Sequence, residues 1–84
     1  PNIGRLMHGG VWGPLQSTIH PLTPTAWTTF ATGCSPGRHG VYDFALFPAG
    51  SYEPVLTDAR HSRMASLFQL LSEAGKRVAA YNIP

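Results

Sequence analysis

Two side chains between His20 and Phe44 could act as nucleophiles, one a hydroxyl and the other a thiol. Thr23 stands directly before Pro24, and Cys34 begins the string Cys-Ser-Pro-Gly-Arg. A hydroxyl at the start of a helix lies near free backbone N–H groups and a partial positive charge, which together favour a phosphate. A thiol acts as a nucleophile only where its surroundings favour the thiolate. The elements around each residue therefore decide which chemistry is available.

Thr23 and Pro24 together predict the start of a helix over residues 24–32. Thr is a favoured N-cap, and Pro suits the first helical position because its missing N–H would be unpaired there. Thr23 therefore has a structural interpretation as a cap and a functional one as a nucleophile beside a bound anion. In the functional case the backbone amides of Thr25 and Ala26 would bind the phosphate, since Pro24 has none. A free Thr is a weak nucleophile, so a metal ion or a base would have to activate it.

Cys34 fits the C-x-P-x-R pattern of sulfatases, in which the Cys is converted to formylglycine. Its surroundings favour a half-buried thiol in the loop over residues 33–40, because Cys34 follows the predicted helix and no helix is predicted after it. The four histidines, His8, His20, His39 and His61, are too far apart in sequence to form a recognisable ligand pair. Asp58 and His61 could bind a metal, but a solvent-facing turn is the favoured interpretation.

The rest of the chain supplies the elements that would position these residues. Residues 3–8 read as a helix ended by glycine, 11–19 as an extended segment, and 41–60 as irregular structure with a hairpin. Residues 62–74 have strong helical periodicity, with Ser62 as the cap, and 77–83 read as a buried strand. This order predicts the αβ half of a doubly wound, mostly parallel sheet flanked by helices. The core is expected to contain Trp27, Phe30, Leu67, Phe68, Leu71 and Val78.

Bulk properties exclude several classes of protein. The chain has 84 residues, enough for one small domain, and a net charge of +2 from scattered Lys and Arg, so nucleic acid is not expected as a structural partner. No apolar run is long enough to span a membrane. A single Cys leaves the redox compartment open. Because the chain lacks an initiating Met and stops just after the predicted strand, we expect it to be a piece of a longer protein.

The string TPTAWTTFATGCSPGRHGVYDF resembles the alkaline phosphatase superfamily, and within it the type I phosphodiesterase and nucleotide pyrophosphatase family. The matching positions are Thr23, Thr32-Gly33, Pro36, His39-Gly40 and Val41. In the related sulfatases the modified Cys lies nine residues before the Thr of the T-G pair, and counting back nine from Thr32 reaches Thr23. The family's nucleophile therefore corresponds to Thr23 and not to Cys34. Thr25, where many relatives have Pro, is a mild departure that leaves the substrate class open.

The resemblance implies a metal-dependent hydrolase of phosphate esters with an α/β fold. It implies two divalent metal ions, with zinc as the expected element, and Thr23 as both nucleophile and ligand of one metal. The substrate would be a small-molecule phosphate ester, and the other metal ligands would lie outside residues 1–84. We therefore expect one partial alkaline-phosphatase-like domain that is inactive alone. A sulfatase using Cys34 and a non-catalytic fragment are the alternatives.

Overall fold

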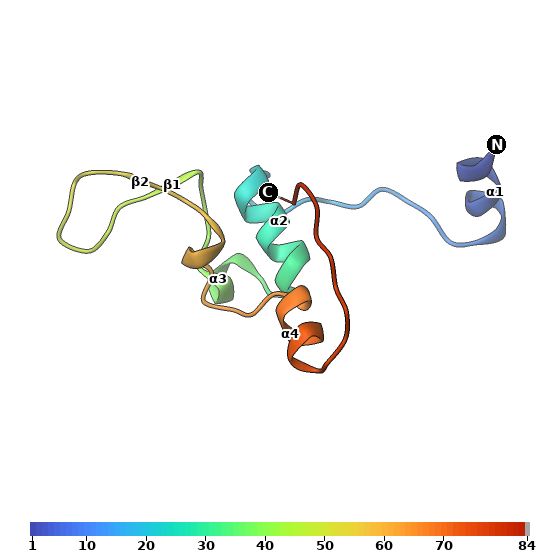
Figure 1. Cartoon of the computed structure of the whole chain (residues 1–84). Coiled ribbons are helices and arrows are strands. Elements are labelled where there is room, and N and C mark those ends of the chain that lie inside the picture. Colours follow the sequence, from blue (N-terminus) through green and yellow to red (C-terminus); the bar gives the residue numbers. More distant parts are fainter. Residues whose placement is uncertain (84) are drawn as a thin grey trace.

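Short helices and one small hairpin make up the computed structural model, which describes residues 1–83. In chain order, the elements are α1 (Asn2–Gly9), α2 (Thr23–Thr32), α3 (Pro36–His39), β1 (Ala45–Leu46), β2 (Val55–Leu56), the 3-10 helix η1 (Ala59–His61) and α4 (Leu67–Glu73) (Figure 1). Strands β1 and β2 pair antiparallel, with Ala45 opposite Leu56. The hairpin expected within residues 41–60 is therefore confirmed.

The predicted parallel sheet is not present in residues 1–83, where the hairpin is the only sheet. Residues 77–83, expected to be a buried strand, are irregular and exposed, and they run back beside α2 (Figure 1). A strand needs a neighbouring strand to accept its backbone hydrogen bonds, and no partner for this segment lies within the described residues. The prediction of a buried strand over 77–83 is therefore wrong for the described structure, because an apolar pattern does not supply the neighbouring strand.

Helix α2 confirms the helix predicted over residues 24–32 and begins one residue earlier, at Thr23. It ends at Gly33, whose φ of 65° lies in the left-handed region and whose N–H donates to the carbonyl of Thr29 over 2.9 Å. Glycine reaches this conformation without the steric penalty that a Cβ atom would bring. The Gly33 signal in the sequence was therefore read correctly.

Helix α3 was not expected, because residues 33–40 were predicted to be a loop. Pro36 occupies the first turn, where its missing N–H leaves no bond unmade, and Gly40 ends the helix with a φ of 80°. The Gly40 N–H donates to the carbonyl of Pro36 over 2.8 Å. The same Pro and Gly residues that suggested a loop are therefore the start and end of a single helical turn.

Helix α4 is shorter than the predicted helix over 62–74, and its cap is Ser66 and not Ser62. The Ser66 hydroxyl accepts the backbone N–H of Gln69 over 3.2 Å, whereas Ser62 donates to the carbonyl of Met64 over 2.9 Å. The periodicity could not separate two serines four residues apart. At the other end, Gly75 takes a φ of 74°, as the glycine signal predicted.

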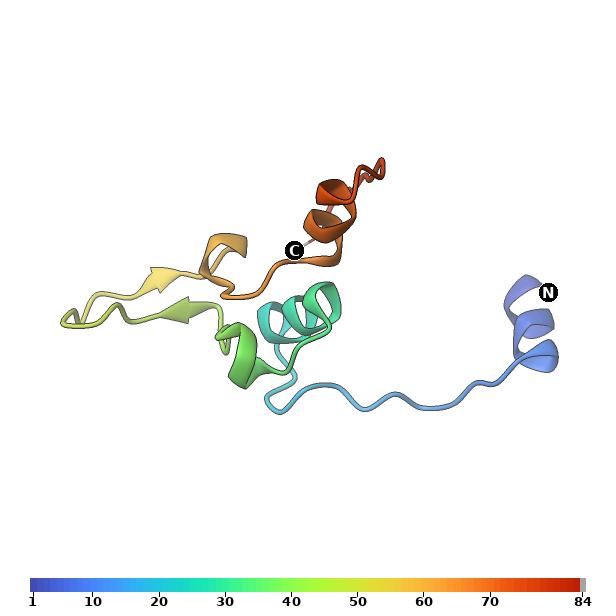
Figure 2. The same cartoon turned by 90° about the horizontal axis from the view of Figure 1, so that it is seen from below.

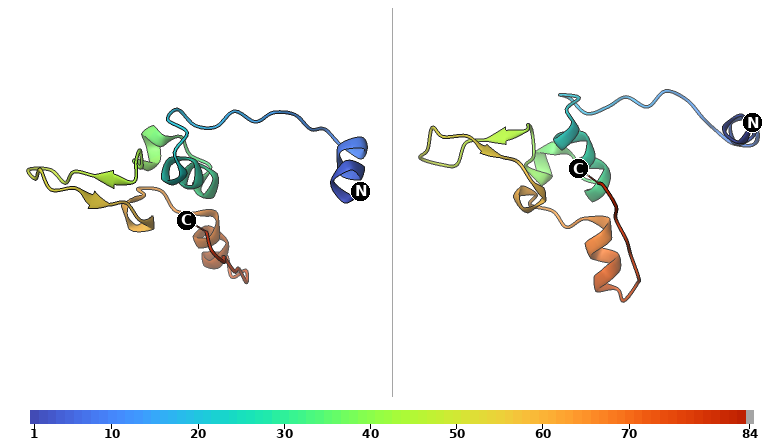
Figure 3. Two further views of the ribbon diagram at one scale, coloured as in Figure 1. Left: turned by 90° about the horizontal axis from the view of Figure 1, so that it is seen from above. Right: turned by 45° about the horizontal axis from the view of Figure 1, so that its top comes forward.

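Helix α1 confirms the helix predicted over residues 3–8, and it lies apart from all other elements in every view (Figures 2 and 3). The extended segment before α2 separates it from the rest. The radius of gyration is 16.1 Å, compared with the roughly 12 Å typical of a compact domain of this length. No helix within residues 1–83 has the length and apolarity needed to cross a membrane.

The predicted hydrophobic core is wrong for the described structure. Val41 is the only apolar side chain in residues 1–83 that is fully buried, at 3% exposure, while Phe30 is 71% and Leu67 is 53% exposed. Trp27 and Phe30 instead form an edge-to-face pair on the surface of α2, with ring centroids 5.5 Å apart. Amphipathic faces bury only against another layer, and the described residues do not provide one for α2 and α4.

Candidate functional site

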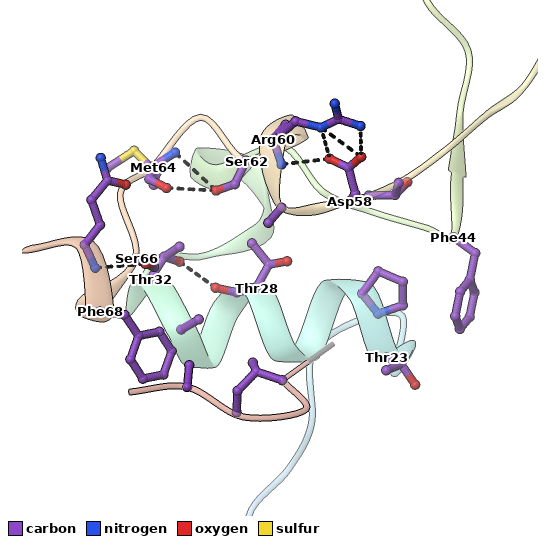
Figure 4. A pocket seen from close by; sticks show the side chains of 17 residues that line it. Thr23, Thr28, Thr32, Phe44, Asp58, Arg60, Ser62, Met64, Ser66 and Phe68 are labelled. Atoms are coloured by element: carbon purple, nitrogen blue, oxygen red, sulfur yellow. Dashed lines mark hydrogen bonds and ion pairs between the residues drawn. The ribbon is translucent and has the colours of Figure 1, made fainter. Parts of the chain in front are cut away.

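A cleft of about 640 Å³ lies between α2, η1, α4 and the segment that follows α4 (Figure 4). Its walls combine hydroxyl groups with apolar side chains and one ion pair. The hydroxyl-bearing residues are Thr23, Thr28, Thr32, Thr57, Ser62 and Ser66, and the larger apolar ones are Phe44, Met64, Phe68 and Ile83. The cleft therefore brings the N-terminal end of α2 together with residues more than thirty positions later in the chain.

Thr23 is the first residue of α2, and its side chain is exposed at the edge of this cleft. Figure 4 shows it at the end of the helix, directed away from the Asp58–Arg60 ion pair. The predicted cap is wrong, because Leu22 occupies the N-cap position and no side chain caps α2. The Thr23 hydroxyl forms no hydrogen bond with any other residue described. It is therefore free to meet a ligand.

The two backbone amides predicted to bind phosphate have different partners. The Ala26 N–H donates to the carbonyl of Leu22 over 2.9 Å, so it already belongs to the first turn of α2. The Thr25 N–H has no acceptor among the described residues, and Pro24 has no N–H. The Thr25 residue is 0% exposed, however, so what the first turn of α2 presents beside the Thr23 hydroxyl is the partial positive charge of the helix.

The Thr25 side chain is fully buried, at 0% exposure, and its hydroxyl has no hydrogen-bond partner. The sequence suggested a phosphate-binding backbone amide at Thr25 and a departure from the family pattern, but it did not indicate this burial. A lone buried hydroxyl destabilises a fold by roughly 1–3 kcal/mol, so the position is not one that packing alone would favour. No signal in the sequence separates Thr25 from the other threonines of α2.

His39 is the fully buried titratable group of the described chain, at 0% exposure. It is part of the family motif, but the sequence indicated no role for its side chain. Its Nε2 lies 2.9 Å from the Thr29 hydroxyl, and its Nδ1 lies 3.1 Å from the backbone nitrogen of Val41. Burial lowers the pKa of His39 below 6.5 because the charged imidazolium loses its hydration. The partner Thr29 is ten residues away, so helical spacing could not reveal the contact.

Asp58 and His61 form a solvent-facing turn, as the sequence analysis favoured. The Asp58 carboxylate binds the guanidinium of Arg60, which lowers the pKa of Asp58 to about 2, and it also accepts the Arg60 backbone N–H. The His61 Nδ1 accepts the backbone N–H of Asp58 over 3.0 Å. The side chains of Asp58 and His61 both cap η1 through these hydrogen bonds, so the turn does not present them to a metal.

Cys34 is half-buried just after α2, which confirms the expected environment of its thiol. Its Sγ donates to the carbonyl of Thr32 over 3.5 Å, and its backbone N–H donates to the Thr32 hydroxyl over 3.2 Å. Contrary to expectation, the short helix α3 begins two residues later. Thr23 and Cys34 lie at opposite ends of α2, a distance of roughly 15 Å for a helix of ten residues.

Metal ligands do not cluster in the part of the chain that the structure describes. No group of three or more His, Cys, Asp or Glu side chains converges anywhere in residues 1–83. His8 bonds the carbonyl of Gly4 within the separate helix α1, and His20 is exposed. At the cleft, Thr23 is the ligand that the family motif suggests, and the other candidate there, Asp58, is paired with Arg60. One hydroxyl does not make a binding site for two divalent ions, which need several carboxylates and imidazoles.

Comparison with known proteins gives one clear result. The model of the family described as type I phosphodiesterase / nucleotide pyrophosphatase matches residues 1–84. This match confirms the family that the motif from Thr23 to Val41 resembles. Members of the family hydrolyse small phosphate esters and typically depend on divalent metal ions. A search of curated proteins and a search of solved structures each found no match.

Proposed function

The chain belongs to the type I phosphodiesterase/nucleotide pyrophosphatase family, and on this premise we propose that Thr23 is the nucleophile of a phosphate-ester hydrolase. The observation that carries the proposal is the state of the Thr23 hydroxyl. It is exposed at the N-terminus of α2, lines the cleft, and is not used as a helix cap. The usual structural explanation for a Thr at this position is therefore absent.

The proposed reaction is a substitution at phosphorus. Thr23 Oγ loses its proton to solvent and forms a bond to phosphorus, while the bond between phosphorus and the leaving-group oxygen breaks and its electron pair stays on that oxygen, which takes up a proton. Water then cleaves the Oγ–P bond and releases the phosphate or monoester. The positive end of α2 would stabilise the phosphoryl oxygens. The Thr25 N–H, which is buried, and the Ala26 N–H, which donates to Leu22, would contribute through that helix charge.

We infer further that these 84 residues are one part of an alkaline-phosphatase-like catalytic domain. Two observations support this. The described residues hold no metal-ligand cluster, and the apolar faces of α2 and α4 are exposed. The remaining ligands of two divalent ions, with zinc as the expected element, would then come from other segments. Without them the 84 residues alone are expected to be inactive, because a free Thr hydroxyl is a poor nucleophile.

The test uses the full-length protein that contains these residues, assayed with Zn²⁺. The substrates are p-nitrophenyl phosphate, bis-p-nitrophenyl phosphate and an aryl sulfate, and the variants are Thr23→Ala, Thr23→Ser and Cys34→Ala. We expect Thr23→Ala to abolish phosphoester cleavage, Thr23→Ser to retain part of it, and Cys34→Ala to leave it unchanged. The preferred ester separates a phosphatase from a phosphodiesterase.

Three other results would overturn the proposal. Cleavage of the sulfate alone, lost in Cys34→Ala, would identify a sulfatase that uses Cys34. No cleavage of any ester, with or without divalent ions, would identify a non-catalytic member of the family. Activity that survives Thr23→Ala would move the nucleophile elsewhere.

A further inference from the structure

The tautomer of His39 follows from its two hydrogen bonds. The backbone N–H of Val41 can only donate, so the Nδ1 atom 3.1 Å away must present its lone pair. The proton of the neutral ring is therefore on Nε2, and it is donated to the Thr29 hydroxyl 2.9 Å away. Protonation of Nδ1 would bring its N–H and the backbone N–H of Val41 together as two donors without an acceptor. The contacts of His39 thus specify one charge state and one tautomer.

His39 also connects three segments of the chain. Its ring reaches α2 through Thr29, its Nδ1 holds the backbone at Val41, and its carbonyl accepts the Arg63 N–H over 2.9 Å. The Arg63 side chain packs over Gly40, where an added Cβ would lie 3.0 Å from the Arg63 Nε. The buried imidazole is therefore the junction between α2, α3 and the segment that leads into α4.

The junction lies on the same face of α2 as the first helical turn. Thr25 and Thr29 are four residues apart, so they lie one above the other on the helix, and Thr25 is fully buried. Because a helix is rigid, the direction of its first residue is fixed once the face that carries Thr25 and Thr29 is fixed. We propose that His39 is a positioning residue, which through Thr29 fixes the rotation of α2 about its axis and so the direction of the Thr23 side chain.

The charged groups around His39 fit this assignment. Helix α2 contains no titratable side chain, α3 contributes Arg38, and the segment packed on Gly40 contributes Arg63. The one carboxylate nearby in sequence, that of Asp43, is exposed and accepts the backbone N–H of Phe44. No described acidic partner therefore favours the imidazolium, and the neutral ring is the form that holds α2.

The inference about Thr23 rests on the proposed function, whereas the inference about α2 does not. The first measurement is therefore structural and uses the full-length protein. Nitrogen NMR of the His39 ring should show a neutral Nε2–H tautomer that persists below pH 6.5. Nuclear Overhauser effects between the Thr23 methyl group and the side chains across the cleft should be present in the wild type and weakened in Thr29→Val, which removes the acceptor of the Nε2–H.

The second measurement is kinetic, with Thr29→Ser as the matched control. Thr29→Val should lower kcat by about tenfold to a hundredfold with little change in KM, because misplacement by an ångström has effects of this size. Thr29→Ser keeps the hydroxyl and should remain close to wild type. His39→Gln, whose amide N–H can reach Thr29, should retain more activity than His39→Asn, which keeps only the acceptor for Val41.

Three results would overturn the positioning role. They are an Nδ1–H tautomer, ordinary titration of His39 near pH 6.5, and unchanged contacts of the Thr23 methyl group in Thr29→Val. Failure of the proposed function has a separate signature, since activity retained in Thr23→Ala would remove Thr23 as nucleophile and leave the NMR results on α2 as they are. If Thr29→Val does not fold, the wild-type tautomer and the comparison of His39→Gln with His39→Asn still decide the question.

Discussion

Gly40 allows a quantitative test of the junction around His39, because a matched glycine exists in the same region. Gly40 and Gly33 each end a helix in the left-handed region, with φ of 80° and 65°. An added Cβ at Gly33 would meet nothing within 4 Å, whereas at Gly40 it would lie 3.0 Å from Arg63 Nε. Ala at either position bears the same backbone penalty, and only Gly40→Ala also displaces Arg63.

The expected loss in the free energy of unfolding follows from the backbone penalty and from the displacement of Arg63. The left-handed conformation destabilises a non-glycine residue by about 1–2 kcal/mol, so Gly33→Ala should lower the free energy of unfolding by that amount. In Gly40→Ala, displacement of the exposed Arg63 side chain adds about 0.5 kcal/mol. If the backbone bond from Arg63 to His39 is also lost, the addition rises to about 1–1.5 kcal/mol. We therefore expect Gly40→Ala to be the more destabilising of the two.

The assay is urea unfolding of the full-length protein that contains these residues, followed by circular dichroism. Arg63→Ala serves as the second arm of a double-mutant cycle, since it removes the side chain that the new Cβ meets. In the Arg63→Ala background the excess of Gly40→Ala over Gly33→Ala should shrink. Equal destabilisation by the two glycine substitutions in the wild type would refute the reasoning, as would an excess that persists without the Arg63 side chain.

Two further predictions concern the cap of α4 and the protonation of His39. Ser66→Ala should lower the free energy of unfolding by about 1 kcal/mol, and Ser66→Asn by much less, because Asn keeps a side-chain oxygen for the Gln69 N–H. Thermal unfolding of both variants checks this. An equal loss of stability in Ser66→Ala and Ser66→Asn would contradict it. Since burial lowers the pKa of folded His39, the unfolded state binds the extra proton, so stability is complete above pH 6.5 and falls below it. The added slope is at most about 1.4 kcal/mol per pH unit, and a urea series at several pH values should show it in wild type and not in His39→Gln.

The sequence alone was sufficient for the family and for the local limits of several elements. The spacing from Thr23 through Thr32-Gly33 to His39-Gly40 identified the family, because a motif is written in consecutive positions of the chain. Glycine correctly marked the end of α2, since Gly33 takes a backbone conformation that other residues avoid. Such signals act over a few residues, which is the range that a sequence pattern covers.

The tertiary structure decided which side chains are buried and which polar groups meet. Thr23 and Thr25 are two residues apart on one helix, yet one hydroxyl is exposed at a cleft and the other is fully buried. The imidazole of His39 meets Thr29 only because α3 folds back onto α2. The expected core failed for the same reason, since a periodic apolar face specifies a helix but not the layer that covers it. Burial and pairing depend on how elements pack, and packing is a property of the whole fold.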